Sequence, residues 1–299
     1  MKKSLTAFLL AVIGMGGARA ELVVDVLGAG GPEITDGRAS TSYLVSRDDR
    51  PILLIDTGPG SALAFERSGA DFSALQAIVY THLHVDHSAD LPAYVKGAYF
   101  VGRQADLPVF GPDGNHFLPA MDVFLQRMFG AEGVYPYLAE YLPGSPAAAY
   151  RLRPTVVTPR EGRVERFKVA DGVTISAISV EHGPLPALAW RVETQDCAVT
   201  FTGDGNGEKK GLAALAHDTD LLVAHLAIGE DAGRIARRLH MPPSKIGEVA
   251  AEARAGGVLL AHRMRRTDGR EARARREIGR HYKGEVQLAE DGTRRVACP

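Results

Sequence analysis

Residues 81–90 read THLHVDHSAD, in which three histidines and an aspartate come within six positions, directly after the apolar run AIVY. Side chains two residues apart on an extended chain share a face, so His82 and His84 can bind one ion together. Asp86 and His87 follow where the strand should turn, which lets them face a second ion. This stretch predicts a site for two metal ions at the end of a strand.

A helix is expected directly after this stretch. Asp90 is a good N-cap residue, and Pro92 suits the first helical turn. The positive end of the helix dipole would then lie near the metals and favour an anionic substrate.

The composition is that of a globular protein without a strong overall charge. Its 299 residues, 45% hydrophobic and 24% charged, are enough for one large domain or two small ones. The formal net charge of −1 gives no overall basic field of the kind that attracts nucleic acid or anionic membranes. We therefore expect a small-molecule anionic substrate and no nucleic-acid partner.

Residues 1–20 have the pattern of a secretory signal peptide. Lys2 and Lys3 precede an apolar run from Leu5 to Ile13, and small residues lead to a cleavage point after Ala20. The apolar run is shorter than the roughly 20 residues that a membrane-spanning helix needs. We expect the mature chain to be periplasmic or secreted and to leave the membrane after cleavage.

Two cysteines remain in the mature chain, Cys197 and Cys298. An oxidising compartment permits a disulfide between them, but the sequence does not show that they meet. A buried, unpaired Cys197 is an equal alternative.

Short β-branched runs alternate with turns and helical patterns along residues 21–299, which we interpret as one domain. Strands in both halves, each flanked by helices, predict an α/β architecture of two packed sheets with helices outside. Between about residues 105 and 150 a helical and loop-like pattern predicts an insertion. We favour a helix packed on the core there over a mobile lid. Its helically spaced apolar residues are Phe117, Met121, Phe124, Leu125 and Met128.

A pair of metal ions needs about seven or eight protein ligands, so further ligands are expected at other strand ends. Three candidates each follow a β-rich run and precede a turn. His182 ends GVTISAISVEH, Asp204 ends CAVTFTGD, and His262 ends GVLLAH.

The ordered set THLHVDH, His182, TGD at Asp204 and AH at His262 resembles the metallo-β-lactamase fold superfamily over nearly the whole mature chain. The resemblance implies an αββα sandwich of two packed mixed β-sheets with helices on both outer faces. It also implies that Asp204 bridges two ions and that Asp56, in LLIDTGPG, supports the metal-binding loop. Zinc is the expected metal, with other divalent ions as alternatives. The implied ligands are His82, His84 and His182 on one ion and Asp86, His87 and His262 on the other.

Further segments resemble the ribonuclease Z and arylsulfatase-like branch, among them VLGAGGP, LPVFGPDG, HGPLPALAWRVE and LAEDG. In ribonuclease Z a glutamate would follow the histidine of the strand DLLVAHLAIGE, whereas here Leu226 follows His225. This departure and the predicted export both weaken a prediction of RNA cleavage. We expect His225 to be a buried supporting residue.

Two further groups of residues are candidates for contacting substrate. His240, in RRLHMPPS, is a candidate general acid or substrate contact, with a structural role before a helix as an equal alternative. Arg263 and Arg265 follow the last predicted ligand and could hold an anionic group, although a charge run is more often a solvated face.

The leading hypothesis is an exported dinuclear zinc hydrolase. It would cleave a small anionic ester, a phosphodiester or an aryl sulfate, by attack of metal-bound hydroxide, with Asp86 and His240 as catalytic residues. One alternative is hydrolysis of a lactone, thioester or β-lactam on the same metal centre. Another is metal binding without turnover. Members of this superfamily often form dimers, so we expect a homodimer. No segment of the sequence indicates where its interface would lie.

Overall fold

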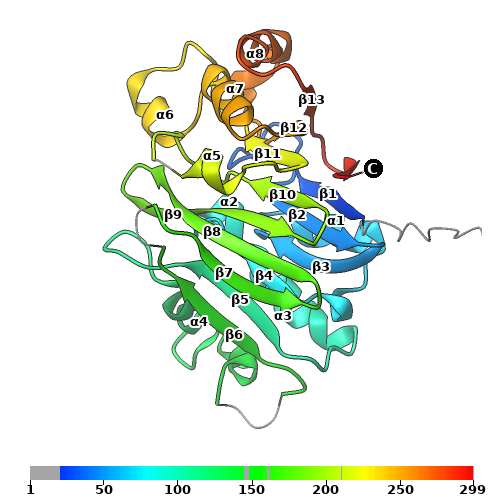
Figure 1. Ribbon diagram of the computed structural model, residues 1–299. Coiled ribbons are helices and arrows are strands. Elements are labelled where there is room, and N and C mark those ends of the chain that lie inside the picture. Colours follow the sequence, from blue (N-terminus) through cyan, green and yellow to red (C-terminus); the bar gives the residue numbers. More distant parts are fainter. Residues whose placement is uncertain (1–20, 145–147, 160–161, 210, 299) are drawn as a thin grey trace, which may run out of the picture.

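The computed structural model describes residues 21–144, 148–159, 162–209 and 211–298. The predicted signal peptide, residues 1–20, lies outside these residues. In the part described, the chain folds into two mixed β-sheets packed face to face, with helices on the outer side of each sheet (Figure 1). This confirms the predicted αββα architecture.

The first sheet is formed mainly by the first half of the chain. Its order is β14-β1-β2-β3-β4-β5-β6. The strands from β14 to β3 pair antiparallel, and those from β3 to β6 pair parallel. The strands are β1 (Leu22–Gly28), β2 (Ser42–Arg47), β3 (Arg50–Ile55), β4 (Ala77–Val79), β5 (Leu107–Pro112), β6 (Leu152–Val157) and β14 (Arg294–Val296).

The second sheet repeats this mixed scheme in the order β13-β12-β11-β10-β9-β8-β7. The strands from β7 to β10 pair antiparallel, and those from β10 to β13 pair parallel. The strands are β7 (Glu165–Ala170), β8 (Val173–His182), β9 (Leu185–Glu193), β10 (Ala198–Phe201), β11 (Leu221–His225), β12 (Gly257–Ala261) and β13 (Glu285–Leu288).

Each sheet packs against the other sheet on one face and against helices on the other. Successive side chains on a strand point to opposite sides, so one strand contributes to both cores. On β1 and β2, Val24, Val26 and Val45 belong to the core between the two sheets. Leu27 and Leu44, on the same strands, face the helices that cover the first sheet. Each fully buried aliphatic side chain contributes about 1.5–3 kcal/mol, so the sandwich holds the strand ends in fixed positions.

Helices cover both outer faces. The first sheet is covered by α1 (Ser61–Ser68), α3 (Leu91–Phe100) and α4 (Met121–Phe129), and the second by α5 (Leu212–Leu215), α7 (Pro243–Glu252) and α8 (Glu271–Ile278). The helix predicted after Asp90 is α3. Asp90 is its N-cap residue but makes no capping bond, because its Oδ2 accepts a hydrogen bond from the backbone N–H of Ala62.

The segment predicted as an insertion at about 105–150 begins with a strand of the first sheet, β5, and becomes helical only after it. Pro108 and Gly111 hide this strand from a pattern reading, because both residues are typical of turns. The predicted packing helix is α4, whose Met121, Leu125 and Phe129 are buried against the sheet. The tyrosine-rich stretch that follows contains the short 3-10 helix η2 (Pro136–Tyr141).

Cys197 and Cys298 form a disulfide, which settles the alternatives that the sequence left open. Cys197 directly precedes β10 of the second sheet, and Cys298 follows β14 of the first. The bond therefore ties the two sheets together. Among the described residues, no helix has the length and apolar character needed to cross a membrane.

Candidate metal centre

The predicted ligands lie at the carboxyl ends of strands. Parallel strands end at the same edge of a sheet, and β3 and β4 run parallel in one sheet as β10, β11 and β12 do in the other. The residues at these ends are Asp56 after β3, His82 after β4, His182 on β8, Asp204 after β10, His225 on β11 and His262 after β12.

The loop between β4 and α3 supplies the remaining ligands. Within it, α2 (Val85–Ser88) carries Asp86 and His87, both of which are buried. The loop is held in place by Thr57, whose N–H donates to the carbonyl of His87 and whose carbonyl accepts from the N–H of Asp90. The turn that the sequence predicted at this point is therefore a short helix.

The seven predicted ligands come together in two sets. The ligand atoms of His82, His84 and His182 all lie within 4.8 Å of one another, and so do those of Asp86, His87 and His262. These are the two sets that the resemblance implied. Asp204 forms a further set with His82 and His87, and so stands between them. The ligand roles of these residues remain predictions.

One carboxylate oxygen lies at the middle of the cluster. Oδ2 of Asp204 is 3.4 Å from Nε2 of His262, 3.8 Å from Nε2 of His87 and of His182, and 4.0 Å from Nε2 of His82. Most of these separations exceed those of hydrogen bonds. Two ligands that are each about 2.1 Å from a tetrahedral zinc ion are about 3.4 Å apart. The spacing therefore fits ligands around a metal better than a hydrogen-bonded cluster.

The histidine rings are fixed by bonds on their outer nitrogens. Nδ1 of His87 donates to Asp56 Oδ2 at 2.8 Å, and Nδ1 of His182 donates to the carbonyl of Leu239 at 2.9 Å. Nδ1 of His262 lies 2.5 Å from Oγ1 of Thr41. Such bonds select the tautomer whose Nε2 lone pair points inward and orient the ring for a metal.

Two of the inward-pointing nitrogens have no partner among the described residues. Nε2 of His87 and Nε2 of His182 are buried and accept no hydrogen bond. A buried polar atom without a partner costs about 1–3 kcal/mol. Metal ions would supply the missing partners, so the residues present fit a bound metal.

Two residues that support or form the cluster have left-handed backbone conformations. Asp56 has a φ of 57° and His262 a φ of 50°. Side chains other than glycine adopt this region at a cost, and such residues gather at functional sites. At both positions the conformation occurs directly after a strand and turns the side chain toward the cluster.

Burial and neighbouring carboxylates act in opposite directions on the histidine pKa values. Burial holds the pKa of His82 and of His262 well below the usual range. Burial also acts to lower the pKa of His87, but Asp86, Asp56 and other nearby carboxylate charge outweigh it and raise the pKa to about 9. A metal ion binding at His87 would therefore displace a proton.

Asp204 is itself held by a chain of buried hydrogen bonds. Nδ1 of His225 donates to Asp204 Oδ1 at 2.7 Å, so Nε2 of His225 accepts from the hydroxyl of Tyr43 at 3.0 Å. Burial acts to raise the pKa of Asp204, but His262, His240 and this hydrogen bond hold it well below its usual value. The structure thus places His225 where the sequence expected a buried supporting residue.

Thr41 and Tyr43 were not identified from the sequence. They lie in STSYLVS, which reads as an ordinary strand. Their contacts with His262 and His225 join residues that are 221 and 182 positions apart. No local signal marks them, because their role depends on the packing of one sheet against the other.

His240 lies beside Asp204, directly after α6 (Arg234–Leu239). Its Nδ1 is 3.7 Å from Asp204 Oδ2 and has no hydrogen-bond partner in the described part of the chain. Burial lowers its pKa to about 4, so the ring is neutral at pH 7. The structure brings His240 to the cluster, and its catalytic role remains a prediction.

The two predicted substrate-binding arginines have other partners. Arg263 is buried, and its guanidinium forms ion pairs with Asp268, Glu271 and Glu290. The guanidinium of Arg265 donates to the hydroxyl of Thr35. Their substrate role stays a prediction that these contacts do not support.

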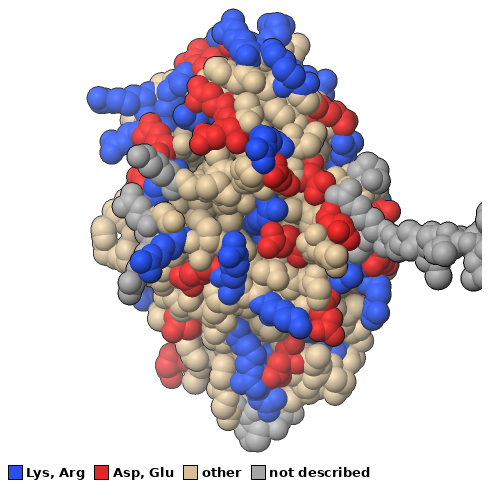
Figure 2. Space-filling model, viewed as in Figure 1, with Lys and Arg blue, Asp and Glu red and all other residues tan. Residues whose placement is uncertain are grey.

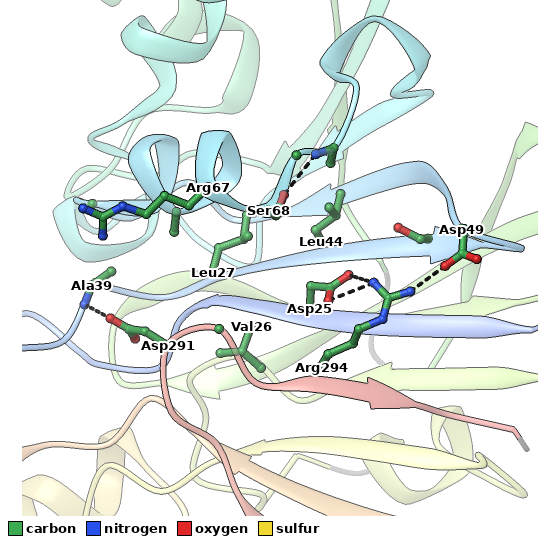
Figure 3. Close-up of a pocket in the computed structure, with 16 residues that line it drawn as sticks. Asp25, Val26, Leu27, Ala39, Leu44, Asp49, Arg67, Ser68, Asp291 and Arg294 are labelled. Carbon is green, nitrogen blue, oxygen red and sulfur yellow. Dashed lines mark hydrogen bonds and ion pairs between the residues drawn. The ribbon is translucent and has the colours of Figure 1, made fainter.

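One pocket among the described residues lies apart from the cluster. It has a volume of about 630 Å³ and is formed by β1, β2, α1 and the turn before β14 (Figure 3). In it, Arg294 binds Asp25 and Asp49, and Asp291 accepts a hydrogen bond from the backbone N–H of Ala39. None of the predicted ligands lines it.

The family model described as the β-lactamase superfamily domain matches residues 52–263. The chain belongs to the metallo-β-lactamase fold superfamily. It is a metal-dependent hydrolase, and the curated relatives that it matches are ribonuclease Z proteins.

Ribonuclease Z of Mycobacterium sp. (strain KMS) is 28% identical to this chain over 292 residues, covering 90% of this chain and 93% of that protein. Among solved structures, the metallo-β-lactamase fold protein YhfI from Bacillus subtilis has a TM-score of 0.71 at 21% identity and covers 93% of this chain and 100% of its own. The short form of human tRNase Z has a TM-score of 0.69 at 18% identity, with coverages of 91% and 98%. These likenesses to solved structures concern the fold.

The expectation of a small-molecule substrate and no nucleic-acid partner is wrong, because the curated relatives are named ribonuclease Z. The expectation used the net charge of the whole chain, which does not describe how charge is distributed. Basic side chains gather over α6 and α8, where acidic ones lie beside them (Figure 2). A net charge near zero can therefore coexist with local basic surface.

Proposed function

We propose that this hydrolase is a dinuclear phosphodiesterase of the ribonuclease Z type, with RNA phosphodiesters among its substrates. The position of Asp204 carries the proposal, because its Oδ2 lies within 4.0 Å of the inward nitrogens of both predicted ligand sets. Such a shared carboxylate suits a two-metal centre, which is a common arrangement for phosphodiester hydrolysis. The ribonuclease Z relatives, which match 90% of this chain, support the same reaction.

The donor set favours two zinc ions. With Asp204 counted in both, each predicted set combines imidazole nitrogens with carboxylate oxygens, a mixture that suits zinc. His82, His84 and His182 would hold one ion, Asp86, His87 and His262 the other, and Asp204 both.

Two divalent ions, when bound, would polarise the phosphate and lower the pKa of water. The chain's own residues orient the reacting groups and donate hydrogen bonds. His225 holds Asp204 through its Oδ1, which leaves Oδ2 directed into the cluster. His240 carries one ring proton at pH 7 and can donate a hydrogen bond to the leaving oxygen. In the ribonuclease Z resemblance, a glutamate would stand where this chain has Leu226. Leu226 is buried and apolar, so His240 has no acidic partner at this position.

A substrate panel tests the reaction. The purified protein would be assayed with an RNA carrying a 3′ extension, bis(p-nitrophenyl) phosphate, p-nitrophenyl sulfate, a lactone and a β-lactam. We expect hydrolysis of the phosphodiesters, its loss after chelation and its return with zinc. Hydrolysis of the lactone or β-lactam, with neither phosphodiester cleaved by metal-loaded protein, would overturn the proposal.

We infer in addition that the protein is exported. Two separate features support this, namely the signal-peptide pattern of residues 1–20 and the Cys197–Cys298 disulfide, a bond that persists in oxidising compartments. Expression of the full chain followed by cell fractionation and N-terminal sequencing tests it. A protein that begins at Met1 and stays with the cytoplasmic fraction would contradict export.

A further inference from the structure

We propose that Arg266 binds a non-bridging oxygen of the phosphodiester that is hydrolysed, an inference that rests on the proposed phosphodiesterase function. Arg266 lies in the 3-10 helix η3 (Arg265–Thr267), which begins three residues after the predicted ligand His262. The sequence pointed instead to Arg263 and Arg265. The structure separates the three by what each guanidinium contacts.

Arg266 is positioned by contacts that leave its charge unpaired. Its Nε donates to the carbonyl of Ala227 at 2.6 Å, and its Nη2 lies 3.0 Å from Sδ of Met264. Ala227 is buried in the segment that follows β11, which is the strand that carries His225. The guanidinium is thus anchored to the segment beside the cluster. An arginine has five N–H donors. Most of those of Arg266 have no hydrogen-bond partner among the described residues, so they remain free for a ligand.

Three nearby arginines differ from Arg266 in this respect. Arg263 is paired with three carboxylates, and both Arg270 and Arg273 are paired with Asp231. In the part of the chain that the structure describes, no carboxylate lies within ion-pair distance of Arg266. Its positive charge is therefore available for binding an anion.

Arg266 lies beside the proposed reaction centre, because it follows His262 by four residues and its Nε binds the carbonyl of Ala227, two residues after His225. Its guanidinium interacts electrostatically with Glu33 and also with Asp204 and His240, the shared carboxylate and the proposed hydrogen-bond donor. A phosphodiester held by metal ions at Asp204, with its leaving oxygen toward His240, would therefore have a non-bridging oxygen facing this side of the cluster. Guanidinium groups suit that task, because their fork of N–H donors matches two oxygens of a phosphate.

The chemistry of the reaction gives this contact a use. Charge on the non-bridging oxygens must be stabilised during phosphoryl transfer, and a cation that is already held in place does so without reorganisation. A neutral ester has no such anionic oxygen. Arg266 would therefore select phosphodiesters over neutral esters as well as bind them.

The test compares Arg266→Gln with Arg266→Lys and with Arg273→Gln as the matched control. Arg273→Gln removes a nearby exposed arginine that is paired with Asp231. Metal content and thermal unfolding would be measured first, and we expect them unchanged because the Arg266 side chain is exposed and contacts no predicted ligand. Binding of adenosine monophosphate, as a product-like probe, would be followed by calorimetry on the metal-loaded protein, alongside hydrolysis of the phosphodiesters.

We expect Arg266→Gln to weaken adenosine monophosphate binding and raise KM for phosphodiesters roughly 10- to 100-fold, the range of a hydrogen bond to a charged group. Arg266→Lys should fall in between, because it keeps the charge but loses the fork, and Arg273→Gln should match the wild type. Equal binding by Arg266→Gln and Arg273→Gln would overturn the inference. If the wild type cleaves no phosphodiester at all, it is the proposed function that fails.

Discussion

Asp56 illustrates how one side chain can organise a metal site without binding the metal. Its Oδ1 accepts the N–H of Thr81, and its Oδ2 accepts both the Thr81 hydroxyl and Nδ1 of His87. The Thr81 oxygen in turn lies 3.1 Å from Nδ1 of His82. A single carboxylate therefore orients one histidine from each predicted set.

We predict that Asp56→Asn weakens metal binding roughly 10- to 100-fold. An asparagine has one acceptor oxygen and one NH2 group, so either orientation of the amide places donors against a Thr81 or His87 donor. Metal affinity would be measured by competition with a chromophoric chelator. Asp71→Asn replaces an exposed N-cap carboxylate that bonds Ser73 and none of the predicted ligands, and it serves as the control. An Asp56→Asn protein that binds both metals like the control would refute this account.

His240 and His84 should respond differently to truncation. We predict that His240→Ala lowers kcat by about 10²–10³, the range for removing one hydrogen-bond donor to a developing charge, while two metal ions per chain are retained. His84→Ala should lose metal as well as activity. Metal analysis of both variants distinguishes these outcomes. Loss of metal from His240→Ala would assign it as a ligand, a role that its proximity to His182 and Asp204 also permits.

At the scale of elements, strand β2 supports the site through residues that face the second sheet. Tyr43 is fully buried and bonds His225 across the sandwich, and Thr41 precedes the strand and bonds His262. The site is therefore built by both sheets, although the ligand-rich loop belongs to the first.

We predict that Tyr43→Phe lowers the free energy of unfolding by about 1–3 kcal/mol, because Nε2 of His225 loses its buried partner. Metal affinity and kcat should fall as well, since His225 then orients Asp204 less firmly. Tyr150→Phe is a matched control, because its buried hydroxyl donates to the carbonyl of Val95 away from the site. The control should lose similar stability and keep metal binding. Equal effects of the two variants on metal affinity would contradict a positioning role for Tyr43.

The strand-end residues could be predicted from the sequence because their positions follow from local patterns. His182, Asp204 and His262 each come where a β-rich run stops, and parallel strands bring such positions to one edge. Thr41 and Tyr43 could not be predicted in this way, since their partners are chosen by the packing of the two sheets. Strand β5 was hidden for a different reason, because its proline and glycine resemble turn residues in a local reading.

At the scale of the whole molecule, charge distribution limited what the sequence could predict. A net charge of −1 suggested no nucleic-acid partner, yet it is a sum over the entire surface. Arg263 lies buried among carboxylates, whereas Arg266 keeps a free charge beside the cluster. Only the folded chain distinguishes an arginine that stabilises the protein from one that can bind an anion.

The disulfide is the feature that spans the whole sandwich, and its removal gives the last prediction. Cys197 and Cys298 are separated by 101 residues and tie the second sheet to the end of the first. Closing a loop of that length restricts the unfolded chain and stabilises the folded one by about 4–5 kcal/mol in the chain-entropy account. We predict that the double variant Cys197→Ser, Cys298→Ser loses about this much unfolding free energy in urea.

The same variant should keep its metal content and kcat at temperatures where it is folded, because neither cysteine touches the cluster. Wild-type protein measured with and without a reductant provides the control, since reduction should reproduce the loss without any change of sequence. A double variant as stable as the oxidised wild type would show that the bond does not constrain the chain. The two sheets would then be held together by their shared apolar core alone.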